Sequence, residues 1–358
     1  RVVYTAVGSK AVNNSLPPTL FPSPLPSILP TIHPTVTCNP SVLPTVDGRV
    51  VNVSTLANIN GAVGVEPGYY SGVSGFFVSI ASKILFVNGT ITNGNILDFS
   101  SKTKFVTGGP SGGSEDGNFE NSNTSFSKVS KMKYDNDSDL LYVCSDDSKL
   151  IRILDFATRY VYTVSNSAGD RFVFTESDGL STGGRFPGMD VDKAGSYLYV
   201  TDRTKLFNLT RDTSSTSISA YVRNEYTALT AFKTANSWPN NVYIFGVAAV
   251  ESHGMIYVTV SLGLNLLLRI PMGVSHYSEI TVLAGDPSVT YGGIGSDDPT
   301  PYLQDGFGTS ALLAFPSSIT YDPVGDSLYF TESFSEFGSE FDDFNVGSMT
   351  VRKYSVYS

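Results

Sequence analysis

The sequence contains few cysteines, few histidines and few charged residues. Among its 358 residues are two cysteines, three histidines and one tryptophan, and only 16 % are charged. Two cysteines are too few for a disulfide-based scaffold. The 33 acidic and 23 basic residues give a net charge of −10, which argues against a general affinity for nucleic acid. No apolar run approaches the roughly 18 residues of a membrane-spanning helix, so we expect no membrane span.

Glycine, tyrosine and phenylalanine are plentiful instead. The chain is 41 % hydrophobic and 12 % aromatic, which is enough apolar surface for one large domain or two ordinary ones. Its 33 glycines and low charge are typical of a β-rich fold with many turns. The sequence begins at Arg1 without a methionine or a signal peptide, and we interpret it as a processed chain.

A short pattern of an apolar residue, an aromatic residue and valine or phenylalanine recurs along the chain. The central aromatics are 56, 57, 58 and 72 residues apart: Phe86, Tyr142, Tyr199, Tyr257 and Tyr329. An Asp-Gly pair and then a phenylalanine precede three of them, starting at Asp116, Asp178 and Asp305. Two more strand-like runs follow, as at 150–155 and 160–164. Four short strands per repeat, bounded by turn residues, are typical of a β-propeller blade.

These repeats resemble the NHL family of β-propellers, whose blades combine an Asp-Gly pair, a phenylalanine, a Leu-Tyr-Val strand and an Ile-Arg strand. The match is clearest over 114–170, 176–202 and 304–354. The resemblance implies an all-β propeller, for which the five repeated aromatics predict five blades. Six blades are the alternative, because members of this family often have six. The predicted propeller is 47–358, with blades near 47–109, 110–170, 171–222, 223–286 and 287–358.

The last repeat lacks an outer strand. Its run at 350–355 parallels the third strand of an earlier repeat at 149–155, whereas the outer strand of that repeat, at 159–164, closely matches residues 1–8. An open strand edge gains hydrogen bonds when another strand pairs with it. We therefore expect residues 1–10 to complete the last blade of their own or of a neighbouring subunit. The pairing strand contains Val2, Val3, Tyr4 and Thr5.

A proline-rich tract occupies residues 11–46. Nine of the 19 prolines lie between Pro17 and Pro44, and most repeat every four residues with a hydroxyl residue after them. Proline at this density favours polyproline II, around which successive hydroxyls would turn by about a third of a revolution. Hydroxyls on all sides of a rod suit a continuous O-glycan sheath, and a plain semi-rigid linker is the alternative. The repeated pairs are Pro18 and Thr19, Pro22 and Ser23, Pro26 and Ser27, Pro30 and Thr31, Pro34 and Thr35, Pro40 and Ser41, and Pro44 and Thr45.

The tract also resembles the hydroxyproline-rich extracellular glycoproteins of algae and other protists, which implies proline hydroxylation and attached sugars. Six Asn-x-Ser/Thr sequons add candidate N-glycosylation sites, although such triplets also arise by chance. They are Asn13, Asn52, Asn88, Asn123, Asn136 and Asn208. Both features predict a secreted protein, extracellular or on a cell-surface appendage. In an oxidising compartment Cys38 and Cys144 could form one disulfide, with free thiols or an intermolecular link as the alternatives.

The sequence contains no pattern that indicates a catalytic or cofactor site. His33 lies in the proline tract, and the remaining His253 and His276 are too few for a three-histidine zinc site. Carboxylates could converge on the propeller axis and bind Ca²⁺. The candidates follow the repeated aromatic strand: Asp146, Asp202 and Glu332. Each of them is better explained as a cap of its own turn. We expect a protein that is not an enzyme and has no resident cofactor.

The length of the tract leads to a functional hypothesis. Residues 9–46 would extend roughly 110 Å as polyproline II, whereas a propeller of this size is on the order of 50 Å across. The first strand could therefore reach a neighbouring molecule, and such a head-to-tail contact would propagate into a filament. The sequence predicts a structural subunit of an extracellular glycosylated fibre, such as a flagellar hair, a surface fibril or matrix. Its partners would be copies of itself and covalent glycans. The alternatives are a Ca²⁺-dependent hydrolase or lactonase-like propeller and a monomeric receptor-like binding propeller.

Overall fold

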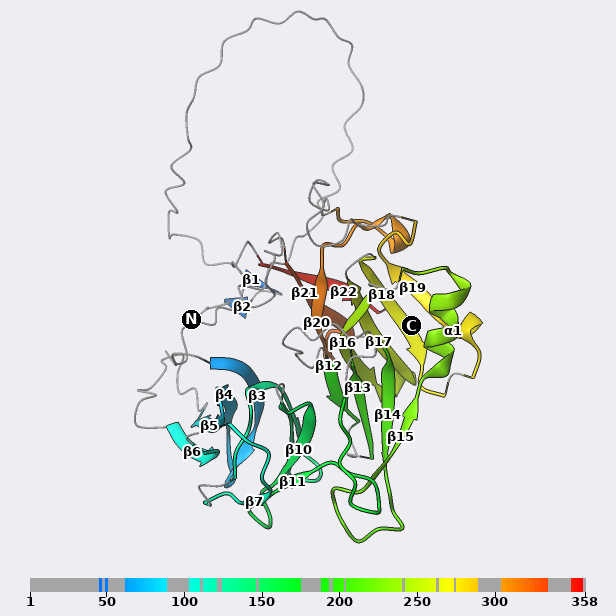
Figure 1. Cartoon of the computed structure of the whole chain (residues 1–358). Helices are drawn as coiled ribbons and strands as arrows, with labels where there is room; N and C mark the ends of the chain where they lie inside the picture. Colours follow the sequence, from blue (N-terminus) through cyan, green and yellow to red (C-terminus); the bar gives the residue numbers. More distant parts are fainter. Residues whose placement is uncertain are drawn as a thin grey trace, which may run out of the picture. The chain divides into compact units, whose positions relative to one another are not determined.

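A computed structural model covers the whole chain and describes most of its second half and much of its first (Figure 1). The predicted first strand, the proline tract up to Pro44, Cys38 and His33 lie outside the described residues, as do Asp146 and the sequons Asn13, Asn52 and Asn123. The described residues are 45–46, 49–50, 62–88, 103–109, 112–120, 124–145, 148–174, 188–192, 196–202, 204–239, 242–261, 264–273, 275–288, 304–333 and 349–356.

The chain divides into two units, residues 1–55 and 56–358. In the first unit, β1 (Thr45–Val46) and β2 (Arg49–Val50) form a two-stranded antiparallel pair. The second unit contains the other strands and the helical segments named below. In the described part of the chain, no helix is long and apolar enough to span a membrane.

Five antiparallel sheets make up the second unit. The first sheet contains β3 (Ala62–Tyr70), β4 (Val73–Ile80), β5 (Lys83–Asn88) and β6 (Thr103–Thr107). The second contains β8 (Val129–Asp135), β9 (Leu140–Ser145), β10 (Leu150–Asp155) and β11 (Tyr160–Thr163), with β7 (Gly117–Asn118) outside β11. The third contains β12 (Gly188–Val191), β13 (Tyr197–Thr201), β14 (Leu206–Arg211) and β15 (Tyr221–Glu225). The fourth contains β16 (Tyr243–Val250), β17 (Met255–Ser261), β18 (Leu266–Pro271) and β19 (Thr281–Ala284), and the fifth contains β20 (Pro316–Asp322), β21 (Ser327–Ser333) and β22 (Met349–Ser355).

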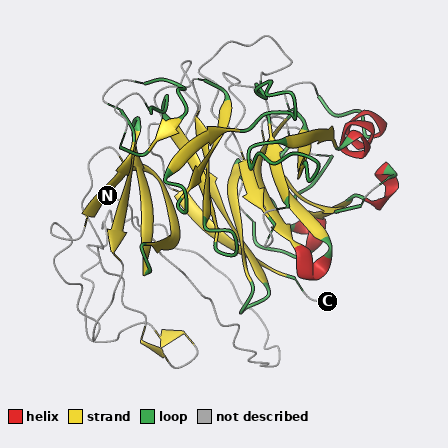
Figure 2. Cartoon of the chain, turned by 90° about the horizontal axis from the view of Figure 1, so that it is seen from below, coloured by secondary structure: helices red, strands yellow, loops and turns green. Residues whose placement is uncertain are grey.

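The first strand of each sheet lies next to the first strand of the following sheet. Thus β3 contacts β8, β8 contacts β12, β12 contacts β16, and β16 contacts β20. The sheets follow one another around a ring, so the fold is a five-bladed β-propeller (Figure 2). The predictions of an all-β propeller and of five blades are confirmed. Helix is confined to α1 (Thr227–Ala235) and three single turns, η1 (Glu251–His253), η2 (Tyr277–Glu279) and η3 (Gly308–Ser310), within the described residues.

The inner and second strands share one register in all five blades. The aromatic of each second strand lies opposite one inner-strand residue: Glu66 with Phe77, Lys133 with Tyr142, Asp190 with Tyr199, Ala248 with Tyr257, and Thr320 with Tyr329. The sequence repeat was therefore wrong in the first blade. Phe86 lies on the third strand, β5, and Phe77 takes the position of the repeated aromatic. Both strands carry an apolar-Phe-Val run, so the pattern alone did not separate them.

The core lies between consecutive blades. Alternate residues of β9 point to opposite neighbours: Leu141 and Val143 pack with first-blade side chains such as Phe77, while Leu140 and Tyr142 pack with third-blade side chains. This explains why every residue of β9 is buried and why the strand has no polar face. Burying a large apolar side chain stabilises the folded state by about 1.5–3 kcal/mol.

Hydroxyl side chains join neighbouring blades near the inner strands. Thr259 on β17 accepts a hydrogen bond from the Gly246 amide (2.8 Å) and donates one to the Ser317 carbonyl of the next blade (2.5 Å). A Cβ atom at Gly246 would collide with that carbonyl, so the close approach of the fourth and fifth blades requires glycine there. Ser79 has the same role between the first two blades, where it accepts from the Gly64 amide (2.8 Å).

Candidate strand-acceptor site

A buried arginine organises the outer part of the second blade. Arg152, on the third strand, is fully buried, and its guanidinium donates to the carbonyls of Ser125 (2.9 Å) and Glu115 (2.8 Å). It also lies 2.8 Å from Asp116 Oδ1. Burial lowers the pKa of Arg152, and the Asp116 carboxylate opposes that shift. A buried cation is costly unless it is paired and hydrogen-bonded, so the loop before the blade has to supply these acceptors.

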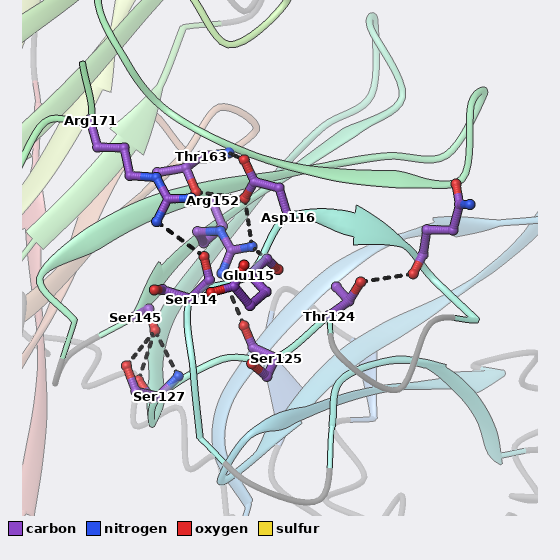
Figure 3. A network of polar contacts seen from close by, with 11 residues as sticks. Ser114, Glu115, Asp116, Thr124, Ser125, Ser127, Ser145, Arg152, Thr163 and Arg171 are labelled. Atoms are coloured by element: carbon purple, nitrogen blue, oxygen red, sulfur yellow. Dashed lines mark hydrogen bonds and ion pairs between the residues drawn. The ribbon is translucent and has the colours of Figure 1, made fainter. Parts of the chain in front are cut away.

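Asp116 connects this arginine to the fourth strand, β11. The Thr163 hydroxyl donates to Asp116 Oδ1 (2.6 Å), and the Thr163 amide donates to Asp116 Oδ2 (3.0 Å) (Figure 3). Thr163 ends β11 directly opposite Arg152. One carboxylate therefore ties the loop, the third strand and the fourth strand together. We call this arrangement of Asp116, Arg152 and Thr163 the latch.

The fifth blade contains the equivalents of the arginine and the aspartate of the latch. Arg352, on β22, donates to the carbonyls of Leu312 (2.8 Å) and Gln304 (3.1 Å), and its Nη2 lies 3.0 Å from Asp305 Oδ1. Arg352 pairs with Phe330, the residue after Tyr329, just as Arg152 pairs with Val143, the residue after Tyr142. The two arginines and the two Asp-Gly aspartates therefore hold equivalent positions in their blades.

The two blades differ in the fourth strand, which carries the threonine of the latch in the second blade. Among the described residues no fourth strand pairs with β22, the red strand in Figure 1. The Asp305 side chain is 98 % exposed, whereas that of Asp116 is 30 % exposed. Phe307, two residues after Asp305, is 97 % exposed, whereas Phe119 in the second blade is buried. Within the described residues, the fifth blade thus presents a strand edge, a carboxylate and an aromatic ring where the second blade holds β11.

Glu332 lies beside Arg352 in the interior of the protein. It is fully buried, accepts a hydrogen bond from the Ala314 amide (2.9 Å) and has its other oxygen 3.4 Å from Arg352 Nη1. Burial raises the pKa of Glu332 to about 7, although Arg352 opposes the shift. Glu332 is therefore a buried ion-pair partner of Arg352.

The predicted calcium ligands do not come together in the described part of the chain. Asp202 accepts hydrogen bonds from the amides of Thr204 (3.0 Å) and Lys205 (2.7 Å), so it caps its own turn, as the alternative interpretation held. Asp146 is outside the described residues, and Ser145 holds the register position that corresponds to Asp202 and Glu332. Among the residues that the structure describes, no group of three or more His, Cys, Asp or Glu side chains could hold a metal ion.

A second set of charged residues lies on the inner strands and was not found from the sequence. Lys133 Nζ on β8 is 3.1 Å from Asp190 Oδ1 on β12, and Asp190 Oδ2 accepts from the Ala249 amide on β16 (2.8 Å). Glu66 on β3 accepts from the Tyr134 amide on β8 (3.1 Å). Burial raises the pKa of Glu66 to about 7, although Lys133 opposes the shift. Each carboxylate bonds the inner strand of the next blade, so these residues link blades.

The two described histidines lie in turns between strands. His253 is in η1, and its Nε2 lies 3.2 Å from Asp326 Oδ1 of the fifth blade. The Tyr321 hydroxyl donates to the same carboxylate oxygen (2.8 Å), so this contact joins the turns of two blades. His276 is exposed, and its ring accepts from the Ser278 amide at the start of η2.

Three of the six sequons fall on described residues. Asn136 is exposed in the turn between β8 and β9. Asn88 ends β5, and Asn208 lies within β14, which pairs with a strand on each side; both are half-buried. Because an N-glycan needs an accessible asparagine, Asn136 is the best placed of the three.

Cys144, on β9, is fully buried in the structure. Its sulfur lies 3.5 Å from the Met189 sulfur of the third blade, and it occupies the position that Ser79 and Thr259 hold in their blades. The thiol therefore replaces a hydroxyl between two blades. Its predicted pairing with Cys38 stays a prediction.

Comparison with known proteins identifies no family for this chain. No model of a protein family matches this sequence, and no curated protein matches it. A luciferin-regenerating enzyme is similar in structure with a TM-score of 0.47 and 12 % identity, over 82 % of this chain and 78 % of its own. A chain of a nidogen–laminin complex has a TM-score of 0.43 and 11 % identity, over 81 % and 80 %. An auxiliary nutrient binding protein from Bacteroides thetaiotaomicron has a TM-score of 0.39 and 13 % identity, over 75 % and 66 %.

Proposed function

We propose that this chain is a structural subunit of an extracellular, glycosylated fibre that assembles head to tail by strand exchange. Residues 1–8 of one subunit would pair with β22 of the next and supply the fourth strand of its fifth blade. The observation that carries the proposal is the edge of β22 beside Asp305, at the position that β11 occupies beside Asp116 in the second blade.

The distance between donor and acceptor favours exchange between molecules. Connections between neighbouring strands in a blade need only a handful of residues. The segment 9–46 would extend roughly 110 Å if its prolines hold it in polyproline II. A donor on such a spacer reaches a neighbour, and each added subunit offers the same β22 edge again. A contact of this heterologous kind does not close on itself and produces a filament.

Composition supports the extracellular and glycosylated part of the proposal. The Pro-Ser/Thr pairs of the tract resemble those of hydroxyproline-rich glycoproteins outside the cell, and the propeller repeats resemble the NHL family. Asn136 offers a sequon in an exposed turn. We assign no catalytic role, and the described carboxylates that were considered for calcium have partners within the protein.

Electron microscopy together with sedimentation velocity tests the proposal on the full-length chain. We expect the wild type to form filaments and to sediment as a broad range of polymers. A variant in which residues 2–5 are replaced by Gly-Ser-Gly-Ser should sediment as monomers, because it keeps the chain length but loses the donor strand. A matched variant with the same replacement at 213–216, a turn in which three of the four residues are exposed, should polymerise like the wild type. Monomeric wild-type protein, or polymers that survive the replacement at 2–5, would contradict the proposal.

A further inference from the structure

We infer that Thr5 completes the latch of the fifth blade, by donating its hydroxyl and its amide to the Asp305 carboxylate while it lies opposite Arg352. This inference deepens the proposed strand exchange by giving the acceptor residue and the register. It rests on that proposal only in making residues 1–8 the occupant of β22, and it holds whether the strand comes from the same subunit or from another.

The first five residues of the donor segment match the fourth strand of the second blade at four positions. Arg1 corresponds to Arg159, Val3 to Val161, Tyr4 to Tyr162 and Thr5 to Thr163. In β11, Val161 and Thr163 are buried, whereas Tyr160 and Tyr162 are half-buried. Residues 3–5 are identical to 161–163, and side chains alternate between the two faces of a strand, so Val3 and Thr5 would share the inward face. The residue that closes the latch in the second blade is therefore present in the donor segment.

The second blade also provides the register. There Thr163 lies opposite Arg152, Tyr162 opposite Ile153 and Val161 opposite Leu154. The same pairing on β22 places Thr5 opposite Arg352, Tyr4 opposite Lys353 and Val3 opposite Tyr354. A shift by one residue would turn Val3 and Thr5 to the outer face and leave the carboxylate without its donors.

Asp305 has the chemistry that this register requires. In the second blade each oxygen of Asp116 accepts from Thr163, and Arg152 reaches one of them. In the fifth blade Arg352 contacts Asp305 Oδ1, and the Asp305 side chain is 98 % exposed. Hydrogen bonds from a hydroxyl and an amide to a carboxylate are charge-assisted. A threonine that arrives on a fourth strand would bury this carboxylate and satisfy it.

A second contact lies at the other end of the donor. The Arg159 guanidinium lies 5.7 Å from the centre of the Phe119 ring, and the Phe119 amide donates to the Arg159 carbonyl (2.9 Å). In the fifth blade Phe307 follows the aspartate by two residues rather than three and is 97 % exposed. Arg1 would cover this ring, which gives an exposed aromatic side chain a partner.

Hydrogen–deuterium exchange of the β22 amides in the full-length protein tests the inference, because it reports pairing within or between subunits. We expect slow exchange across 351–355 in the wild type. T5V and D305N should each speed that exchange at least tenfold, and the double variant should exchange no faster than the faster single variant. T5S keeps the hydroxyl and should exchange like the wild type. D137N, which changes an exposed carboxylate in a turn of the second blade, should also leave the rate unchanged.

The outcomes separate this inference from the proposed function. Equal β22 exchange in the wild type, T5V and D305N would overturn the latch, and it would point to another fourth strand or to none. Loss of protection in T5V and D305N from a protein that never polymerises would keep the latch and overturn the fibre. Filaments that form equally well with T5V and D305N would keep the fibre and overturn the latch. Exchange of the β10 amides, which belong to the second blade, shows whether D305N has disturbed the fold. T5V removes the same proposed contact without a substitution within residues 47–358.

Discussion

Arg152 and Arg352 hold the same position in two blades, and each guanidinium donates to two main-chain carbonyls and one aspartate. Around Arg152 the aspartate is also held by a fourth strand, through Thr163. Around Arg352 the aspartate faces outward beside an open strand edge in the described structure. The second blade therefore shows which contacts a fourth strand would add to the fifth blade.

Replacing Arg152 should destabilise the propeller strongly. Arg152→Met removes a buried cation, leaves two carbonyls without its hydrogen bonds and leaves the Asp116 carboxylate without its ion-pair partner, so we expect a loss of about 3 kcal/mol or more in the free energy of unfolding. Urea unfolding followed by circular dichroism measures this. Arg171 is an exposed arginine whose one described bond, to the Ser114 carbonyl, is 3.4 Å long, so Arg171→Met should stay within about 0.5 kcal/mol of the wild type. Similar losses in the two variants would contradict this role of Arg152.

Removing the Thr163 hydroxyl measures how much its hydrogen bond to Asp116 stabilises the second blade. Thr163→Val keeps the shape of the side chain and the amide bond but removes the hydroxyl donor to Asp116, so the free energy of unfolding should fall by about 1–2 kcal/mol. Thr234→Val provides the matched control, because the Thr234 hydroxyl bonds only its own helix at an exposed position. If both substitutions have the same small effect in urea unfolding, the latch contributes nothing measurable to stability.

Glu332 makes the stability of the protein depend on pH. Its pKa is about 7 in the folded state, raised by burial from the ordinary value of 4.5. Between these pH values the folded state holds a proton that the unfolded state has released, so the free energy of unfolding should fall as pH rises from 5 to 8. In Glu332→Gln this fall should be smaller by on the order of 1–3 kcal/mol. The remaining slope should belong partly to Glu66, whose pKa is raised to about 7 for the same reason.

A pH series of urea unfolding curves tests this. Glu120→Gln serves as the control, because Glu120 is exposed and pairs at the surface with Arg159. Its curve should run parallel to that of the wild type. A Glu332→Gln curve that is also parallel would mean that Glu332 titrates in its ordinary range.

Glycosylation should distinguish the described sequons. In protein made in a eukaryotic secretory pathway, Asn136→Gln should lower the mass by one N-glycan and leave the thermal midpoint unchanged, because Asn136 is exposed in a turn. Asn208→Gln should leave the glycan mass unchanged, because Asn208 is half-buried within a strand paired on both sides. Mass spectrometry of the intact protein measures both. A glycan at Asn208 and none at Asn136 would contradict this account of accessibility.

The repeat in the sequence predicted the blades because one strand in each keeps an aromatic between apolar neighbours. It located Tyr142, Tyr199, Tyr257 and Tyr329 on second strands, and it failed in the first blade because β4 and β5 carry the same kind of run. Helix α1 was not predicted. It is inserted between the third and fourth blades, outside the repeated unit, and packs its Leu229 and Phe232 into the core between them.

The contacts of the site could not be predicted in the same way. The sequence pattern contains both Asp116 and Arg152, but their pairing depends on the conformation of the segment before β8, which also supplies the Glu115 and Ser125 carbonyls. The inner-strand residues Glu66, Lys133 and Asp190 share a register yet differ in charge and size, so no repeat marks them. Asp202 and Glu332 looked equivalent, but one caps a turn and the other pairs with Arg352.

The most direct test of strand exchange is a cross-link between two differently marked full-length chains, each with Cys38→Ser. Tyr4→Cys is placed on one chain and Lys353→Cys on the other, since the proposed register sets these residues opposite each other. After mixing and mild oxidation, the account predicts a disulfide-linked dimer that contains one copy of each variant and forms in neither variant alone. The result that would contradict it is no mixed dimer, together with a chain carrying both substitutions that closes its disulfide within the monomer.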